Sequence, residues 1–459
     1  MRIWSAPLPQ GAPHPAQPLP PPMSDGASSL EIVPVRGRIV LSATARNRIA
    51  NYLNFATTAL VGLIVNPILL AALGTSGFGI WKTIARLFET VIATQGGATQ
   101  ALKWVLAREN AQASADALRR RVGSALVNWA LWAAPFAVLA LGLVLALPWM
   151  FPQAGPDLTI AGLILAINGL VAGLVSIPAY SLIGVNKGYL ALGLSALMAG
   201  IVGAGLVFAA LSGWGLVGMA AMVLFGSVPG AALCYWLAWR AIPWWGIAAP
   251  GPVDMADINR LGGWTLGWSA IEKVLLASEL VLIALLAGAA MAGQYVFTAY
   301  AAQTALVICL LTTNAAMPGL GARLAAGNRA EAAMIIAQTR RTSLLLSFGV
   351  GAVIICANAA FVALWAGDAM YLGAGANALI VIAAIQLAHI RTEAQILDAM
   401  LIVKPRVLLG AGAVVVGIAC AIAGFVLTAD ITWMIAGLIA GRLALTLGLP
   451  AIARRAVRR

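Results

Sequence analysis

Long apolar stretches alternate with short polar gaps along the chain from Asn51 to Ile452. A stretch of roughly 20 apolar residues, rising ~1.5 Å per residue as a helix, crosses the ~30 Å hydrocarbon core of a bilayer. Because lipid offers the backbone no hydrogen-bond partner, such spans are helices. The predicted fold class is therefore all-α, a polytopic bundle of about twelve transmembrane helices. The predicted spans are residues 50–73, 78–101, 123–148, 158–184, 190–212, 214–239, 262–287, 293–317, 342–366, 372–399, 406–428 and 432–452.

Composition supports the same class of protein. The chain is 62% hydrophobic and 9% charged, and its mean hydropathy is +0.94. A water-soluble protein of this composition would have too little polar surface to stay in solution. The sequence therefore predicts a membrane protein.

Lys and Arg occur in every second gap between the predicted spans. The basic gaps contain Lys103 to Arg121, Lys187, Arg240 to Arg260, Arg323 to Arg341 and Lys404 to Arg406, whereas the alternate gaps contain neither residue. The positive-inside rule places the basic gaps and both termini in the cytoplasm. Because the net charge of +13 is spread over these gaps beside anionic lipid headgroups, we expect no nucleic-acid partner.

The two halves of the chain resemble each other. Gly74, Gly79 and Trp81, after the first predicted span, match Gly288, Gly293 and Tyr295 at a constant offset. Each half holds six spans, so both halves enter the membrane in the same direction, as in a parallel repeat. We expect two pseudo-symmetric six-helix lobes around a central cavity in one chain, and hence a functional monomer.

This repeat and the distribution of prolines define the predicted domains. Residues 1–47 are rich in proline and are predicted to be a disordered cytoplasmic tail, part of which depends on whether Met1 or Met23 is the start. The lobes are predicted at 48–240 and 262–452, joined by a cytoplasmic linker at 241–261 and followed by a basic cytoplasmic tail at 453–459.

Charged residues inside predicted spans are candidates for a substrate cavity. Lys82, Arg86 and Glu89 are spaced four and three residues apart, so they share one face of the second span. Ionisable groups are costly in lipid and usually face a cavity or a partner. We expect these three side chains to line the cavity.

The seventh predicted span carries a second polar face. Trp264, Trp268, Glu272 and Glu279 follow helical spacing, and aromatic faces beside carboxylates suit the stacking and hydrogen bonding that a sugar offers. The alternative is that Glu272 and Glu279 form ion pairs with Arg86 or Lys82 that join the lobes.

Four further residues are candidates for roles in transport. Arg442 lies near the middle of the last span and is a candidate for the cavity. His389, together with Glu272, is a candidate for binding a coupling ion. Asn66 and Pro67 are gating candidates, because Pro67 frees a backbone carbonyl near Leu63 and bends the helix. No residue spacing indicates a metal site, and we expect no cofactor.

The turn Leu73-Gly-Thr-Ser-Gly-Phe-Gly-Ile-Trp81, the preceding Asn66-Pro67 and the long basic gap after the second span carry a family resemblance. From roughly residue 45 to residue 452 the chain resembles the polysaccharide flippase branch of the multidrug, oligosaccharidyl-lipid and polysaccharide exporter superfamily. The resemblance implies two six-helix bundles around a V-shaped cavity lined by helices one, two, seven and eight. It would bring Arg86, Glu89, Glu272 and Tyr295 near that cavity.

The resemblance also implies a function. Such flippases move an undecaprenyl-diphosphate-linked oligosaccharide from the cytoplasmic to the outer leaflet of the bacterial inner membrane by alternating access, for lipopolysaccharide O-antigen, capsule or exopolysaccharide biosynthesis. A cavity with Lys82, Arg86 and Arg442 would attract the diphosphate. The expected partners are the lipid-linked oligosaccharide, membrane lipids and polysaccharide polymerase machinery.

Two other functions remain open. A multidrug or metabolite antiporter of the same superfamily is the first alternative, although a carrier of organic cations should have a cavity rich in carboxylates. A membrane-embedded polysaccharide polymerase or glycosyltransferase is the second. Such an enzyme needs catalytic groups in a substantial loop, and the outer gaps are only a few residues long. We therefore expect a transporter rather than an enzyme.

Overall fold

The computed structural model describes residues 32–35, 38–400 and 402–458. It confirms the all-α fold class, with one short antiparallel strand pair, β1 (Ile32–Val35) and β2 (Arg38–Leu41), before the first helix. The helices are α1 (Ala43–Ile92), α2 (Gly96–Glu109), α3 (Ala115–Met150), α4 (Asp157–Gly184), α5 (Gly188–Leu211), α6 (Gly215–Ala241), α7 (Pro252–Leu286), α8 (Ala289–Ala325), α9 (Arg329–Ala366), α10 (Ala374–Ala399), α11 (Lys404–Thr428) and α12 (Ile431–Arg458). Short 3-10 turns lie at Ala93–Gln95, Pro152–Ala154 and Asp368–Met370.

The predicted spans correspond to these helices with one rearrangement. Ten helices in the described part of the chain are long and apolar enough to cross a membrane. One of them, α1, contains the first two predicted spans as two arms that meet at Gly74, whose φ of 66° and ψ of 172° break the helical geometry. The remaining predicted span is α7, which carries Glu272, Lys273 and Glu279 and is not among the ten. The chain is a multi-pass membrane protein.

Regular structure extends across three of the predicted boundaries. The disordered tail was predicted for residues 1–47. Within it, Ile32–Val35 and Arg38–Leu41 form strands, and α1 begins at Ala43. Residues 1–31 lie outside the described residues. The second half of the predicted linker at 241–261 is the beginning of α7. The predicted basic tail after residue 452 continues α12 up to Arg458. Charge alone cannot locate these boundaries, because a helix can continue beyond the membrane with polar residues.

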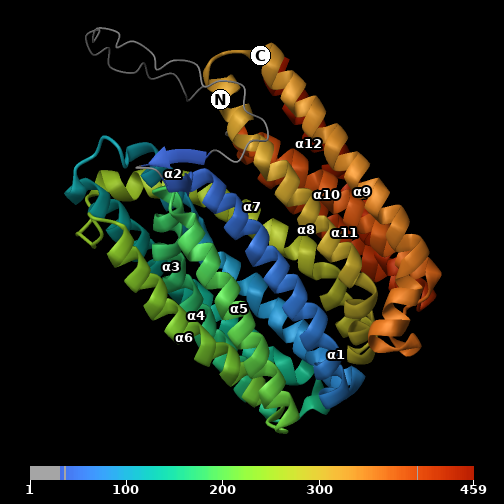
Figure 1. Ribbon diagram of the computed structural model, residues 1–459. Coiled ribbons are helices and arrows are strands. Elements are labelled where there is room, and N and C mark those ends of the chain that lie inside the picture. Colours follow the sequence, from blue (N-terminus) through green and yellow to red (C-terminus); the bar gives the residue numbers. More distant parts are fainter. Residues whose placement is uncertain (1–31, 36–37, 401, 459) are drawn as a thin grey trace, which may run out of the picture.

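The helices form two bundles with the same internal arrangement. Figure 1 shows α3–α6 together on one side and α9–α12 on the other, with α1, α7 and α8 between them. In the first half α1 packs on α5, α4 on α6, α5 on α6 and α3 on α4; in the second half α7 packs on α11, α10 on α12, α11 on α12 and α9 on α10. This is the pattern of contacts that the sequence repeat predicts.

The two lobes meet closely at the end of the molecule that lacks basic residues, which we call the opposite end. Gly79 of α1 lies so near Ala289 of α8 that a Cβ on Gly79 would overlap the Ala289 carbonyl. A Cβ on Gly293 would lie 2.7 Å from the carbonyl oxygen of Thr75. Since Gly79 and Gly293 are equivalent in the repeat, the contact is reciprocal, and only glycine permits this approach of two backbones.

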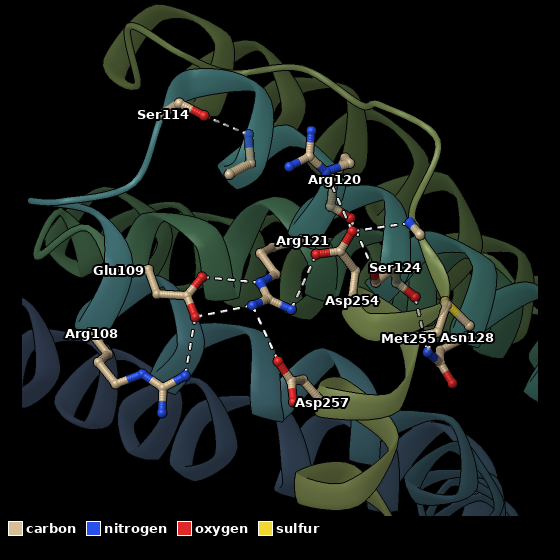
Figure 2. A network of polar contacts seen from close by, with 12 residues as sticks. Arg108, Glu109, Ser114, Arg120, Arg121, Ser124, Asn128, Asp254, Met255 and Asp257 are labelled. Carbon is tan, nitrogen blue, oxygen red and sulfur yellow. Dashed lines mark hydrogen bonds and ion pairs between the residues drawn. The ribbon is translucent and has the colours of Figure 1, made fainter. Parts of the chain in front are cut away.

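The other end, which we call the basic end, holds α2, the start of α3 and the end of α12. An ion-pair network there attaches α7 to the first lobe (Figure 2). The Arg121 guanidinium lies 3.0 Å from Glu109 of α2 and 3.3 Å from both Asp254 and Asp257 of α7. The segment before α7 is also fixed, because the Arg119 side chain donates to the carbonyl of Trp244 at 3.0 Å. The connection between the lobes is therefore bound to α3.

We predict that Gly79→Val weakens closure of the opposite end. The added side chain must overpack against the Ala289 backbone, at a penalty of roughly 1–3 kcal/mol, which corresponds to about a 5- to 150-fold shift in the equilibrium between closed and open states. The measurement is maleimide labelling, from the opposite end, of a cysteine replacing Val296 of the cavity wall, in a variant without the four native cysteines. Gly142→Val is the control, because no heavy atom lies within 4 Å of its Cβ position. Equal labelling of both variants would contradict the prediction.

Candidate functional site

One cavity in the described part of the chain, which we call the main cavity, lies between the two arms of α1 and helices α4, α7 and α8. Its volume is about 490 Å³, within the range of pockets that hold small ligands. The charged residues that line it are Lys82, Arg86 and Glu89, the three that the sequence predicts on one face of the second span. Tyr295 and Asn66 line it as well.

The kink at Gly74 determines the depth of these side chains. Asn66 and Lys82 each lie eight residues from Gly74 on the two arms of α1, so both sit ~12 Å from the kink along their helices. Arg86 lies one turn farther along the second arm. Its guanidinium pairs with Glu89 at 3.0 Å, a bond between residues one turn apart on the same helix.

Lys82 has no carboxylate within ion-pair distance among the described residues. Its ammonium group instead lies 5.4 Å from the centre of the Phe78 ring, a cation–π contact. Because Glu89 balances the charge of Arg86, Lys82 leaves the cavity wall with one uncompensated positive charge.

A second cavity of about 150 Å³ adjoins the first on the side of the second lobe. Arg86, Tyr295 and Gln303 line both cavities, and Glu279 lines the second. Behind the wall, Arg442 is 1% exposed and donates to Glu279 at 2.7 Å, and the Tyr295 hydroxyl donates to the same carboxylate at 2.5 Å. Arg442 also donates to the Leu275 carbonyl at 2.7 Å. The carboxylate of Glu279 is thus held inside the second lobe.

The predicted pairing of the two glutamates with Arg86 or Lys82 is wrong. Glu279 pairs with Arg442 of α12, and Glu272 pairs with Arg391 of α10, so both bonds lie within the second lobe. The sequence could not reveal these partners, because residues in different spans can be assigned to one another only when the packing of the helices is known.

The predicted sugar contacts of Trp264 and Trp268 have no counterpart in the cavities. The described residues that line the main cavity and its neighbours between the lobes include neither tryptophan. Trp268 is 5% exposed and stacks under the guanidinium of Arg406 at 4.4 Å, and Trp264 faces Lys404 at 5.7 Å. Both rings therefore belong to the contact between α7 and α11.

A ring nitrogen of the coupling-ion candidate His389 lies 3.3 Å from the carbonyl of Thr446 on α12. His389 is absent from the described linings of these cavities, and its position gives no support for contact with a transported substrate.

Pro67 leaves one carbonyl of its helix without a donor from that helix. It lies inside α1, and the carbonyl of Leu63, four residues earlier, accepts a hydrogen bond of 2.7 Å from the Trp365 indole of α9. The neighbouring Tyr300 hydroxyl of α8 donates to the carbonyl of Ala59. Side chains of the second lobe therefore bind the α1 backbone next to the proline.

A third cavity, of about 330 Å³, separates α1 from α8 nearer the basic end. Asn51 and Asn54 of α1 and Val307 and Leu311 of α8 line it, and it shares Thr58, Tyr300 and Gln303 with the main cavity. The lobes are thus joined at the opposite end, whereas a passage from the main cavity opens between them toward the basic end.

Sequence reasoning missed several residues of the main cavity. Asn168 of α4 and Tyr300 and Gln303 of α8 line it, and Trp365 lies beside it. A polar residue alone in an apolar span, such as Asn168, was the available signal. Tyr300 and Gln303 are three residues apart, so they share a helical face.

Comparisons with known proteins identify the fold. No family model matches the chain, and no curated protein matches it in sequence. Solved structures of membrane transporters do match it in fold.

One is described as the inward-facing conformation of a multidrug resistance MATE family transporter of the MOP superfamily, with 13% identity, a TM-score of 0.70, and coverage of 90% of this chain and 98% of that one. The outward-facing conformation of such a transporter matches with 15% identity, a TM-score of 0.68, and coverage of 91% and 95%. A MOP superfamily transporter from Pyrococcus furiosus matches with 14% identity, a TM-score of 0.69, and coverage of 91% of this chain and 95% of that one. Its binding pocket is described as having reverse polarity, which suggests a different function for that protein. The chain has the MATE-like transporter fold.

We predict that Glu279→Gln destabilises the protein by about 3–5 kcal/mol, because it leaves the Arg442 guanidinium buried without a counter-charge. The double variant Glu279→Gln, Arg442→Gln should recover most of this loss. Denaturation of the purified protein in detergent micelles measures both. Glu89→Gln is the control: its carboxylate is 53% exposed, so the change should cost less than about 1 kcal/mol. A double variant no more stable than Glu279→Gln would show that the pair is not the source of the effect.

Proposed function

We propose that this protein is a membrane transporter that works by alternating access and carries an anionic amphiphile. The observation that supports the charge of the substrate is Lys82, whose ammonium group stands on the cavity wall without a counter-ion among the described residues. In a site of low dielectric constant, one uncompensated charge selects strongly for a substrate of opposite sign.

The distribution of the remaining charges supports the same proposal. Of the acids that the sequence places near the cavity, Glu89 pairs with Arg86, Glu272 with Arg391 and Glu279 with Arg442. Because each of these three carboxylates is already paired, none of them is free to bind an organic cation. The contacts therefore favour an anion over a cation.

The passage between α1 and α8 supports an amphiphilic substrate. It leads from the main cavity toward the basic end, and its lining combines apolar side chains such as Val307 and Leu311 with polar ones such as Asn51 and Asn54. The headgroup of a lipid would enter the cavity through this passage while its hydrocarbon tail stays in the bilayer. A polyprenyl-diphosphate-linked oligosaccharide, the substrate that the sequence resemblance implies, has this chemistry. The direction of transport in this proposal is from the cytoplasmic to the outer leaflet of a bacterial inner membrane.

A multidrug antiporter is the second candidate function. The solved structures that support it are those described as multidrug resistance MATE transporters, at TM-scores of 0.70 and 0.68. At 13% and 15% identity these matches concern the fold, and the positive charge of Lys82 on the cavity wall is the observation that supports the flippase over the antiporter. Cells without the gene would then become sensitive to cationic drugs while their surface polysaccharide stays intact.

We predict that deletion of the gene causes a complete lipid-linked oligosaccharide to accumulate and the corresponding surface polymer to disappear. Lys82→Gln should reproduce this defect in a complemented strain, because it removes the uncompensated charge, and Lys82→Arg should restore most of the transport. Lipid extracts resolved by mass spectrometry, with the variants at equal abundance, provide the measurement.

Lys404→Gln is the matched control, because it removes an exposed lysine that contacts Trp264 outside the cavities. An unchanged lipid pool after deletion of the gene would reject the flippase proposal. Normal transport by Lys82→Gln would reject the role of Lys82.

A further inference from the structure

Helix α7 begins inside the first lobe. The carboxylates of Asp254 and Asp257 each lie 3.3 Å from the Arg121 guanidinium of α3, and Asp254 also lies 3.4 Å from Arg120 (Figure 2). One turn farther on, Ile258 is 0% exposed. The residues of its hydrophobic cluster belong to α2, α3 and α4: Leu102, Leu106, Leu118, Val122, Ala125 and Ile177. Both charge and packing thus attach the first two turns of α7 to the first lobe.

The chain that leads into α7 is bound to the same lobe. The backbone N–H of Ala248 donates to the Arg119 carbonyl at 3.2 Å, and a Cβ on Gly123 would lie only 2.0 Å from the Ala248 carbonyl oxygen. The Trp244 indole donates to the side chain of Asn110 at 2.8 Å. The connection between the lobes therefore offers no slack, because moving it would break these contacts with α2 and α3.

The middle of α7 is bound to the second lobe. Trp264 and Trp268 contact basic side chains of α11, and the Trp268 ring lies 4.4 Å from the Arg406 guanidinium. The Leu275 carbonyl accepts a hydrogen bond of 2.7 Å from Arg442 of α12. The ion pairs of the two glutamates on α7 join it to α10 and α12. One helix is thus attached to both lobes, at different points along its length.

Two consecutive glycines lie where α7 passes from one lobe to the other. The passage from Ile258 to Trp264 takes less than two helical turns, and Gly262 and Gly263 lie within it, in a helix that is continuous through both. Glycine weakens the interior of a helix. Close packing does not explain Gly263, because it is exposed and, outside its own helical turns, no heavy atom of the described residues lies within 4 Å of its Cβ position. Paired small residues are, however, a common site of helix bending.

We infer that the hinge between the lobes lies within α7, at Gly262 and Gly263. This inference rests on the alternating access of the proposed function, in which one bundle rocks against the other. Because the two sides of the glycine pair are bound to different bundles, a rocking movement must change the shape of the helix between them. The second moving body then begins at Trp264, while the first turns of α7 stay with α3.

Gly263→Ala should hold the protein in the state described here, in which α7 is helical throughout and the opposite end is closed. Alanine favours a helix interior over glycine by roughly two- to fivefold in an equilibrium constant. The measurement is maleimide labelling, from the opposite end, of a cysteine replacing Val296, in the full-length protein without its four native cysteines in nanodiscs. The labelling rate should fall by roughly the same factor, and the thermal midpoint should not fall.

Gly349→Ala is the matched control. Gly349 lies inside α9 of the second lobe, is exposed, and likewise has no heavy atom of the described residues within 4 Å of its Cβ position outside its own helical turns. Its variant gains the same helix stability without lying between the lobes, so its labelling rate should equal that of the wild-type protein. Equal labelling rates in Gly263→Ala and Gly349→Ala would overturn the hinge.

Distances between spin labels test the attachment of each part of α7. The labels replace three exposed residues, Val253 of α7, Leu131 of α3 and Met334 of α9. The distances are compared with those in Gly79→Val, in protein whose increased labelling shows that the opposite end has opened. The distance from Val253 to Leu131 should stay the same, whereas that from Val253 to Met334 should change.

The outcomes separate the hinge from the proposed function. If the distance from Val253 to Leu131 changes on opening, the start of α7 leaves the first lobe, and the hinge is overturned while alternating access stands. If neither distance changes although the opposite end has opened, the lobes do not rock, and alternating access by this movement fails together with the hinge.

Discussion

The close contact of two backbones at the opposite end is the constraint on which the arrangement of this transporter fold depends. Gly79 meets Ala289, and Gly293 meets Thr75, so the backbones of two equivalent helices are in contact near their first turns. The stacked rings of Phe78 and Phe297, 5.1 Å apart, extend this contact toward the cavity. Because the lobes are held together there, the space between them widens toward the basic end, and the main cavity connects with the passage between α1 and α8.

The charged residues around the cavities have different kinds of partner in the two lobes. In the second lobe, Glu279 and Glu272 are bound by Arg442 and Arg391, so the charges there hold α7 to α12 and α10. In the first lobe, the pair of Arg86 and Glu89 lies on a single helix and joins no other element. Lys82 beside it is therefore free to interact with a ligand. Unpaired charge in a membrane protein is costly, and among the described residues Lys82 has only the Phe78 ring beside its ammonium group as a compensating contact.

Much of the fold could be predicted from the sequence, because membrane spans depend on local properties of the chain. Apolar length gave the helices, and the matched glycines gave the repeat: Gly74 and Gly288 both have positive φ, at 66° and 93°. The face shared by Lys82, Arg86 and Glu89 was also correct, since it needs only helical periodicity.

Features that depend on packing between helices could not be predicted. The partners of Glu272 and Glu279 lie more than a hundred residues away in the chain, and the tryptophans of α7 face α11 instead of the cavity. Asn168 was overlooked, because one polar residue in α4 has no periodic partner to mark its face. The predicted and observed boundaries differ where polar residues continue a helix, since hydropathy does not indicate the end of a helix there.

Pro67 links the shape of α1 to the separation of the lobes. Its ring removes the N–H that would bind the Leu63 carbonyl, and Trp365 of the second lobe supplies the missing donor at 2.7 Å. Straightening α1 cannot restore the bond within the helix, because proline has no N–H in any conformation. When the lobes separate at this level, the Leu63 carbonyl loses its donor, which costs several kcal/mol in an apolar setting unless water or a ligand enters. Separation of the lobes at this level would therefore have to bring water or a ligand to one backbone carbonyl of α1.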